Sequence, residues 1–367
     1  MLVFLLFGFL GCQNENPPAS DGNQPDTEVF YNGVDLSFTA EIEGAGISFS
    51  DSGQILPVAE IFKRRGVNIV RLRLWHTPSS SHSNLSEVLD FARIVKAKGM
   101  DILLDIHYSD TWADPSQQAK PLAWNSLSFA ELADSVYTYS HDVMNAFIAQ
   151  ETPPLIVQIG NEINSGFLWN SGRVGGSFDT NWINFGSLLK KAIAGIHDAE
   201  EKGETKVMLH YAGTDGADWF FQNIRQQEIP YDIIGISYYP FWHGKNLDSL
   251  KTALNGLAHT FQKDIFIVET GYPWTLSWND WTNNIVGLES QLIPEYPSSP
   301  DGQRRFLYDL KHLVRGLHNH RGIGWCYWAP EYVAFRGPQA TNGSSWENGA
   351  LFDFTNTSLP SISIFTE

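Results

Sequence analysis

Cysteine is scarce in this sequence of 367 residues, which contains only Cys12 and Cys326. Cys12 follows an apolar N-terminal stretch, and Cys326 lies within an apolar run near the other end, so no disulfide framework is expected. Stability must therefore come from a buried core, and 43% hydrophobic residues are enough to build one. The length allows two average domains or one α/β barrel, which commonly needs about 250 residues or more.

Positive charge is scarce as well. Lys and Arg total 24 against 41 Asp and Glu, which gives a formal net charge of -17. Proteins that bind nucleic acid use Lys and Arg to neutralise phosphates, so nucleic acid is not an expected partner. This excess of acidic residues suits a protein outside the cytoplasm that binds an uncharged ligand. The 13 Trp residues supply flat rings, either for the core or as platforms for sugars.

The apolar N-terminal run is too short to span a bilayer permanently. It covers residues 1–11, whereas a transmembrane helix needs about 20. We interpret residues 1–12 as a signal peptide. Phe9-Leu10-Gly11-Cys12 resembles a bacterial lipoprotein cleavage box, in which the cysteine carries the lipid. Two features depart from that box, because Phe9 stands where Leu is usual and no Lys or Arg precedes the run.

This leader predicts export and a lipid anchor on Cys12, at the outer membrane or cell surface of a Gram-negative bacterium. An ordinary export signal, followed by secretion, is the alternative. Residues 13–28 are rich in Pro, Asn, Asp, Gly and Ser and are predicted to form a flexible tether. Residues 29–367 remain for a single folded domain, expected to be monomeric.

From residue 29 onward, short apolar strands alternate with amphipathic helices. Eight strands are predicted, at residues 33–38, 67–75, 101–107, 155–162, 206–212, 232–239, 264–270 and 323–328. Helices are predicted at residues 56–65, 84–98, 128–150, 181–201, 217–227, 248–262 and 301–319. The helix at 84–98 also has a start signal, because Asn84 and Glu87 resemble a capping box.

Strands that alternate with helices pair in parallel through right-handed crossovers. Eight such units predict an α/β protein with a closed (β/α)8 TIM barrel, whose active site lies at the C-terminal strand ends. The alternative is an open doubly wound sheet. Such a sheet usually has a Gly-rich phosphate loop after its first strand, and Gly33-Val34-Asp35-Leu36-Ser37 is not one.

Two of the predicted strands end in a glutamate. The run 155–162 ends in Asn161-Glu162, and the run 264–270 contains Glu269. A carboxylate is costly to bury, so each must have a partner or a function. Two carboxylates that flank a bond are what glycoside hydrolysis requires, one as the acid and the other as the nucleophile. An Arg from 67–75 and a Tyr from 232–239 would keep Glu269 ionised, while Glu162 lacks an obvious cation.

Simpler interpretations exist for single residues. One glutamate at a strand end is more often a structural acceptor, so the hypothesis depends on the pair. His76, His107 and His210 lie on separate predicted strands, which favours core or substrate contacts over metal binding. Arg71 and Arg73 share a strand face because they are two residues apart, and Arg73 is favoured as the functional one because it is nearer the strand end.

Several motifs together resemble glycoside hydrolase family 53, the endo-β-1,4-galactanases of clan A. The similarity runs from about residue 29 to 365. Its most specific part is the sequence from Asp105 to Pro115, which reads DIHYSDTWADP. The other parts are GVDLS at 33–37, RLRLW at 71–75, GNEI at 160–163 and ETGYPW at 269–274.

The resemblance implies a (β/α)8 barrel that cleaves β-1,4-galactan, the side chain of type I arabinogalactan and pectin, with retention and without a cofactor. It implies Glu162 as the acid/base and Glu269 as the nucleophile. Further roles would be binding of the sugar 2-hydroxyl by Asn161, support of the nucleophile by Arg73 and Tyr238, and a sugar platform on Trp328. Other predicted substrate contacts are Asp105, His107, Tyr108, Asp110 and Trp112, of which both aspartates are also explained as structural hydrogen-bond acceptors.

The sequence also departs from that family in two places. Residues 327–331 read Tyr-Trp-Ala-Pro-Glu where many relatives have Trp-Glu-Pro-Ala. Some bacterial relatives bind a structural calcium ion between the seventh and eighth loops. Here Asp280 and Asn284 are the candidate ligands that remain, so a calcium site is an open expectation.

Two other functions compete with a galactanase. The first is another clan A endo-glycanase, such as a mannanase or xylanase, because one fold supports many activities. The second is a surface lipoprotein that binds a glycan without cutting it. The specific 105–115 motif argues against the first, and the presence of both Glu162 and Glu269 argues against the second.

Overall fold

Eight parallel strands close into a barrel in the computed structural model, which describes residues 29–200 and 203–367. The ring order is β1-β12-β11-β10-β9-β6-β5-β4, and β1 pairs with β4 to close it. The barrel strands are β1 (Tyr31–Asp35), β4 (Ile69–Leu74), β5 (Asp101–Ile106), β6 (Ile156–Ile159), β9 (Lys206–Ala212), β10 (Ile233–Tyr238), β11 (Asp264–Thr270) and β12 (Gly322–Trp328). The predicted TIM barrel and all eight of its strands are confirmed.

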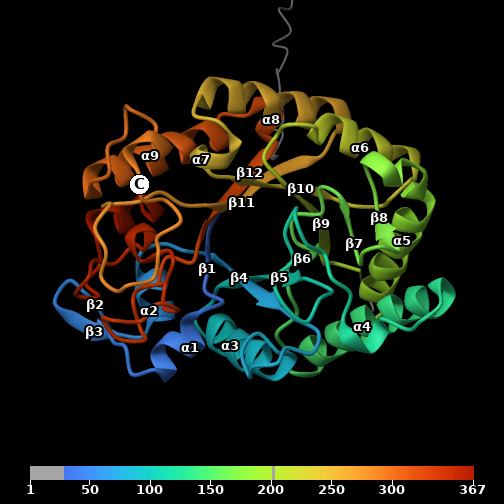
Figure 1. The fold of residues 1–367 in the computed structure, drawn as a ribbon, viewed down its shortest axis with the longest axis horizontal. Helices are drawn as coiled ribbons and strands as arrows, with labels where there is room; N and C mark the ends of the chain where they lie inside the picture. Colours follow the sequence, from blue (N-terminus) through green and yellow to red (C-terminus); the bar gives the residue numbers. More distant parts are fainter. Residues whose placement is uncertain (1–28, 201–202) are drawn as a thin grey trace, which may run out of the picture.

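Helices surround the strands as an outer ring (Figure 1). Each predicted helix is present, and the main ones are α2 (Val58–Arg64), α3 (Leu85–Ala97), α4 (Phe129–Ala149), α5 (Trp182–Asp198), α6 (Ala217–Gln226), α8 (Leu247–Phe261) and α9 (Pro300–Arg315). The last helix is shorter than predicted, because Gly316 caps it after Arg315. Asn84 accepts the N–H of Glu87 as predicted, but the Glu87 carboxylate bonds to the N–H of Ser83, so the capping box is only half formed.

The strands are buried on both faces, as their apolar sequences predict. Alternate residues of each strand point into the barrel, and the deepest inward layer is apolar. That layer consists of Ile69, Leu103, Ile156, Met208, Ile233, Phe266, Val268 and Cys326. The next inward residues along the chain are mostly polar, so the barrel changes from an apolar base to a polar upper layer at the C-terminal strand ends.

Short elements between the barrel units were not predicted. They comprise α1 (Thr39–Gly44), α7 (Pro240–His243), the hairpin β2 (Phe49–Asp51) with β3 (Gln54–Leu56), and the hairpin β7 (Gly166–Phe167) with β8 (Gly172–Arg173). The 3₁₀ turns are Leu122–Trp124, Gly176–Asn181, Glu289–Gln291, His318–His320, Glu347–Gly349 and Pro360–Phe365. Their sequences are too short for a hydrophobic period to identify them.

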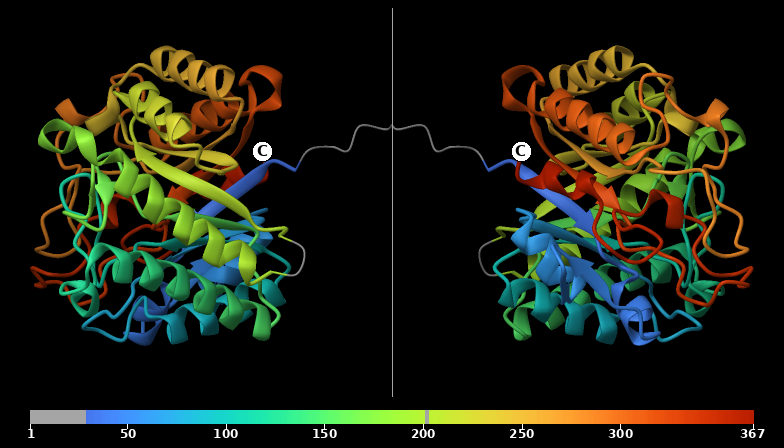
Figure 2. Two further views of the ribbon diagram at one scale, coloured as in Figure 1. Left: turned by 90° about the vertical axis from the view of Figure 1, so that its right-hand side faces the viewer. Right: turned by 90° about the vertical axis from the view of Figure 1, so that its left-hand side faces the viewer.

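The C-terminal end lies beside the start of β1, and the loops after β11 and β12 extend on the opposite side (Figure 2). Phe365 stacks on Trp325 with ring centroids 5.1 Å apart, which fixes this end to the barrel. None of the helices in residues 29–200 and 203–367 is long and apolar enough to cross a membrane. The predicted signal peptide, the lipidated Cys12 and the tether at 13–28 lie outside the described residues.

Candidate active site

A β-bulge turns Glu269 into the barrel. Ile236 of β10 pairs with Ile267 of β11, but the next pair is Ser237 with Glu269, so β11 has one extra residue, Val268. The bulge allows consecutive side chains of β11 to point the same way, which strict alternation would forbid. The Glu269 carboxylate therefore lies above the apolar layer, where it is only 6% exposed.

Glu269 has two partners. Its Oε1 is 2.8 Å from Nη1 of Arg71, and its Oε2 accepts a hydrogen bond of 3.1 Å from the hydroxyl of Tyr239. Both contacts stabilise the ionised form. Burial nevertheless raises the pKa of Glu269 to about 7, and the Arg71 charge limits the increase.

Arg71 is the centre of the polar layer. Nη1 also contacts Asp35 at 2.7 Å, and Nη2 donates to Asp105 at 2.8 Å and to Asn161 at 2.9 Å. Nε donates to Gln158 at 3.3 Å. A guanidinium has five N–H groups, and this one distributes its bonds over five side chains, including Glu269. One cation thus balances three buried carboxylates.

Glu162 lies just beyond the end of β6, with β9 and β10 between its strand and β11 in the ring. Its Oε1 accepts a hydrogen bond of 2.7 Å from Ser237, and no cation lies within ion-pair distance of it among the described residues. Burial, and then the charge of Glu269, raise the pKa of Glu162 to about 8. Because Arg71 contacts Glu269 and not Glu162, the proton is held on Glu162, which is the order that an acid and a nucleophile require.

Asn161 is fixed from both ends of its amide. Oδ1 accepts from Arg71, and Nδ2 donates to the carbonyl of Ala113 at 2.8 Å. An amide nitrogen carries two hydrogens, so a second one is left for another acceptor. The position next to Glu162 is compatible with the predicted contact to a sugar hydroxyl.

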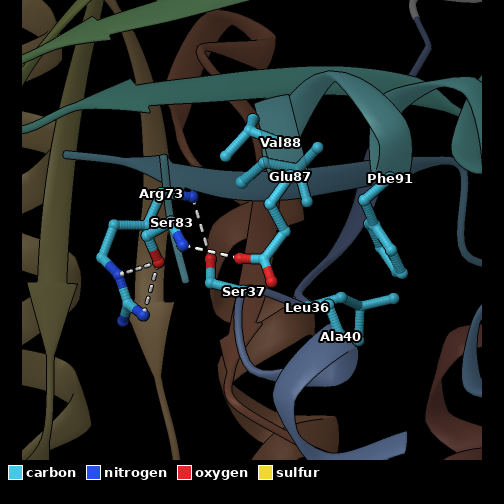
Figure 3. Close-up of a pocket in the computed structure, with 9 residues that line it drawn as sticks. Leu36, Ser37, Ala40, Arg73, Ser83, Glu87, Val88 and Phe91 are labelled. Atoms are coloured by element: carbon cyan, nitrogen blue, oxygen red, sulfur yellow. Dashed lines mark hydrogen bonds between the residues drawn. The ribbon is translucent and has the colours of Figure 1, made fainter. Parts of the chain in front are cut away.

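Arg73 does not support Glu269, so that prediction is wrong. Its guanidinium bonds to Oγ of Ser83, at 2.9 Å from Nη2, and the two groups line a small cavity behind β4 (Figure 3). It lies over the rings of Phe38, Trp75 and Trp112, 4.0 Å from the centroid of the last. Arg73 is nearer the strand end, as predicted, but the nucleophile candidate reaches the deeper Arg71.

Trp112 and Trp328 lie at the same end of the barrel and are both partly exposed. Their ring centroids are 6.3 Å apart, and the rings meet edge to face. Trp328 also packs against Trp346 at 5.4 Å. Two partly exposed tryptophans held in fixed orientations at this end of the barrel are suited to stack on sugar rings.

Tyr238 and Tyr108 do not reach the site, which corrects two predictions. The Tyr238 hydroxyl donates to the carbonyl of Gly244 at 2.8 Å. The Tyr108 hydroxyl bonds to Ser140 of α4 at 2.7 Å, so this ring lies among the outer helices. Side chains alternate along a strand, and both residues lie at positions that point away from the barrel interior.

Three other residues predicted to contact substrate already form hydrogen bonds within the protein. Asp105 is 0% exposed, and its oxygens accept from Arg71, Gln158 and His107. His107 uses both ring nitrogens, one towards Asp105 and one towards Trp75. Both residues are therefore buried and already paired within the protein, which corrects those predictions. Asp110 anchors its loop through the N–H groups of Thr77 and Leu122 and is partly exposed, as its structural explanation implied.

Asp280 and Asn284 lie in the loop after β11 beside Glu347, which follows β12. Each of the three has a buried side-chain atom without a hydrogen-bond partner, namely Asp280 Oδ2, both amide atoms of Asn284, and Glu347 Oε2. Burial, and then the charge of Asp280, raise the pKa of Glu347. Two buried carboxylates and an amide oxygen without a cation match the oxygen ligands that calcium prefers. In the described residues, no group of three or more His, Cys, Asp or Glu has metal-site geometry.

Four site residues are not among those that the sequence predicts. The glutamate contacts predicted for Arg73 and Tyr238 are made by Arg71 and Tyr239. Ser237 and Gln158 have no strong sequence signal, because they are small or neutral polar residues inside apolar strands. Counting alternate positions from the apolar layer would have identified three of them, since Gln158 is two residues after Ile156, Arg71 two after Ile69, and Ser237 four after Ile233.

Known proteins are similar to this chain over nearly its whole length. The family model described as Glycosyl hydrolase family 53 matches residues 31–365. An arabinogalactan endo-beta-1,4-galactanase of Cellvibrio japonicus is 37% identical over 348 residues, which cover 93% of this chain and 91% of that protein. The solved GH53 catalytic domain of Ignisphaera aggregans is 36% identical with a TM-score of 0.85, and covers 92% of this chain and 95% of its own.

A solved fungal β-1,4-galactanase is 32% identical with a TM-score of 0.80, and the alignment covers 91% of this chain and 98% of that one. The match to the family model extends over nearly the whole barrel, and relatives well above 30% identity span most of their own length. The chain therefore belongs to glycosyl hydrolase family 53.

Proposed function

We propose that this protein is a retaining endo-β-1,4-galactanase that hydrolyses the galactan of type I arabinogalactan and pectin. The observation that carries this proposal is the pair of glutamates at the C-terminal ends of β6 and β11, of which Glu269 is bound to Arg71 and Tyr239 and Glu162 has no cation within ion-pair distance among the described residues. The galactanase activity of similar proteins supplies the substrate class.

In the first step, the Glu269 carboxylate attacks the anomeric carbon and forms a covalent ester. The bond from that carbon to the glycosidic oxygen breaks, its electron pair stays on the oxygen, and Glu162 donates a proton to this leaving group. In the second step, Glu162 takes a proton from water, and the resulting oxygen attacks the anomeric carbon. Glu269 is released as a carboxylate, and Glu162 is again protonated.

Release of reducing sugar from linear galactan, with mannan and xylan as controls, tests the substrate class. We expect galactan alone to be cleaved at a high rate, with products of several lengths at early times. NMR spectra of fresh products should show the β-anomer first, because two displacements restore the configuration. Equal cleavage of mannan or xylan would favour another clan A activity, and no cleavage at all would favour a binding protein.

We propose that Asp280, Asn284 and Glu347 hold a structural calcium ion between the last two barrel loops. Their unpaired buried oxygens support this assignment. A bound ion would offset the burial of two carboxylates and tie the loop after β11 to that after β12. It would have no part in the chemical steps.

Calcium removal is expected to lower the melting temperature. A ligand present at 100 times its Kd stabilises the folded state by about 2.7 kcal/mol, so chelation with EDTA should cost several degrees. Calorimetry with EDTA and then with excess calcium measures the loss and its recovery. Asp280→Asn removes one charge and should abolish the response, whereas wild-type protein that melts at one temperature in both buffers would contradict the calcium site.

We also propose that the chain is exported and anchored by a lipid on Cys12. β1 starts at the face of the barrel opposite the active-site loops, so an anchor ahead of it would be joined to the barrel at that face (Figure 2). Cells grown with a radioactive fatty acid should label the wild-type protein and not Cys12→Ser. Equal label in both would exclude the anchor.

A further inference from the structure

A chain of three side chains ends at Glu162. His210 of β9 and Ser237 of β10 are both 0% exposed. Nε2 of His210 lies 2.8 Å from Oγ of Ser237, and Oγ lies 2.7 Å from Oε1 of Glu162. At the other side of the same ring, Nδ1 of His210 is 3.2 Å from the backbone N–H of Glu162. One histidine therefore contacts both the backbone and, through Ser237, the side chain of Glu162.

The direction of this chain follows from hydrogen-bond accounting. Burial, and then the charge of Arg71, hold the pKa of His210 well below its usual value, so the ring is neutral and has one N–H. The N–H of Glu162 has Nδ1 as its acceptor, and a buried backbone N–H without a partner costs about 1–3 kcal/mol. Nδ1 therefore accepts, Nε2 carries the proton and donates to Ser237, and the Ser237 hydroxyl is left to donate to Glu162.

A competing contact involves Asn161, whose Oδ1 is 2.9 Å from Nδ1 of His210. A proton on Nδ1 would serve that contact and reverse the chain. Oδ1 of Asn161 already accepts from Arg71 at 2.9 Å, so it does not depend on a donor from the ring. Gln158 lies 3.0 Å from Nδ1, but its amide has two hydrogens, and Asp105 at 2.6 Å and the carbonyl of Gly160 at 3.0 Å compete for them, so Gln158 does not decide the tautomer. The Glu162 N–H, whose acceptor is Nδ1, favours the lone pair at that position.

We propose that Ser237 and His210 are positioning residues that hold Oε1 of Glu162 as a hydrogen-bond acceptor and thereby leave its proton on Oε2. A carboxyl group that accepts at Oε1 has Oε2 free to carry the proton to the leaving group. The same chain fixes the backbone of Glu162, which has a left-handed φ of 48° that a side chain rarely adopts. The inference rests on the proposed function, because it assigns a role within the acid step.

The other charged groups around Glu162 come from several elements. They are Glu269 on β11, Arg71 on β4 and Asp114 in the loop after β5. Tyr239, which follows β10, also faces both glutamates. Removal of the Ser237 hydroxyl changes none of these groups, so its effect on Glu162 can be separated from theirs. The Ser237 bond favours the carboxylate form of Glu162, and its loss must raise the pKa of Glu162.

Ser237→Ala tests the proposal. We expect kcat/KM on galactan to fall about 10- to 100-fold, the effect of losing one hydrogen bond to a charged group. An aryl galactobioside with a 2,4-dinitrophenolate leaving group needs no proton, so its first step should change less than about 3-fold. The alkaline limb of the pH profile on galactan should move to higher pH, because Glu162 must be protonated to act and would lose its proton later.

Two variants control for an effect of packing. Ser237→Thr keeps the hydroxyl and should restore most of the galactan activity. Ser140→Ala removes an equally buried hydroxyl from α4 and should leave both substrates and the pH profile unchanged. An equal loss on both substrates without a pH shift would mean that Ser237 is only structural and would overturn the proposal.

The tautomer of His210 can be measured directly. Long-range ¹⁵N–¹H spectra of wild-type protein with labelled histidine should show His210 protonated at Nε2 and not at Nδ1. The opposite tautomer would reverse the chain and contradict the assignment of the Glu162 proton.

If wild-type protein does not cleave galactan at all, the proposed function fails, whereas active protein with an unaffected Ser237→Ala variant refutes only this inference.

Discussion

Glu269→Gln is expected to lower kcat on galactan by about 10⁴-fold or more, the range seen when a covalent nucleophile is removed. An amide cannot form the ester with the anomeric carbon. It retains the shape of the carboxylate, and its oxygen and nitrogen can still face Arg71 and Tyr239. The loss should therefore come from chemistry and not from unfolding. Steady-state kinetics and the melting temperature, measured on the same preparation, check both points.

Glu331→Gln is the matched control. Glu331 is another fully buried glutamate at this end of the barrel, bonded to the N–H of Phe38 and the hydroxyl of Thr39. Burial raises the pKa of Glu331 to about 8, so the protonated group resembles an amide and the variant should keep its activity within a few fold. A Glu269→Gln variant as active as this control would exclude Glu269 as the nucleophile.

Azide distinguishes the roles of the two glutamates. In Glu269→Ala, azide can take the place of the missing carboxylate, attack an activated aryl β-galactoside from that face and give an α-galactosyl azide. In Glu162→Ala, the covalent intermediate still forms, and azide in place of water gives the β-galactosyl azide. NMR of the products separates the anomers, and exchanged outcomes would reverse the two assignments.

The barrel could be predicted from the sequence because its signal is repeated eight times. Each apolar strand is followed by a helix, so an error of two residues at one boundary does not change the fold. Both glutamates could be predicted as well, because a charged residue at the end of an apolar run is conspicuous. Short elements such as α1 and the β7–β8 hairpin had no comparable period.

The partners of the glutamates could not be predicted with the same success, because depth in the barrel is a property of register. Arg73 is nearer the strand end, yet Arg71 is level with Asp35 and Leu103 across the sheet and reaches Glu269. The bulge at Val268 places Glu269 opposite Ser237, and no residue in the sequence of β11 predicts a bulge. Tyr238 and Tyr239 are consecutive, so their side chains point to opposite sides of the strand. At the end of a strand, the sequence does not show which of the two points into the barrel.

Arg71→Met is expected to be the most destabilising single change in the polar layer. The methionine fills similar space but leaves Asp35, Asp105 and Glu269 buried without their cation. Removal of one partner from a buried ion pair costs about 3–5 kcal/mol, and here three carboxylates share the loss. Chemical denaturation measures the change in the free energy of unfolding. Activity should fall by at least about 10³-fold, because Glu269 loses the charge that keeps it ionised.

The loss of stability in Arg71→Met should depend on pH in a predictable direction. Burial raises the pKa values of Asp105 and Glu269, and Arg71 lowers them, so without the guanidinium both should rise above those of the unfolded chain. A group of this kind contributes stability at pH values below its unfolded pKa and loses that contribution as pH rises through its folded pKa. The deficit relative to wild type should therefore be largest near pH 8 and shrink towards pH 5, where the carboxyl groups of the variant can be neutral.

Arg73→Met gives the comparison that isolates this effect. Arg73 lies on the same strand and is almost as buried, but its polar partner is the neutral Ser83 hydroxyl. Its replacement loses a hydrogen bond and cation–π contacts, which are worth about 2–3 kcal/mol together, and leaves no carboxylate without a partner. The stability deficit should then be nearly constant between pH 5 and 8. A similar pH dependence in both variants would show that Arg71 does not hold the site together through charge, since the two arginines differ mainly in the carboxylates they contact.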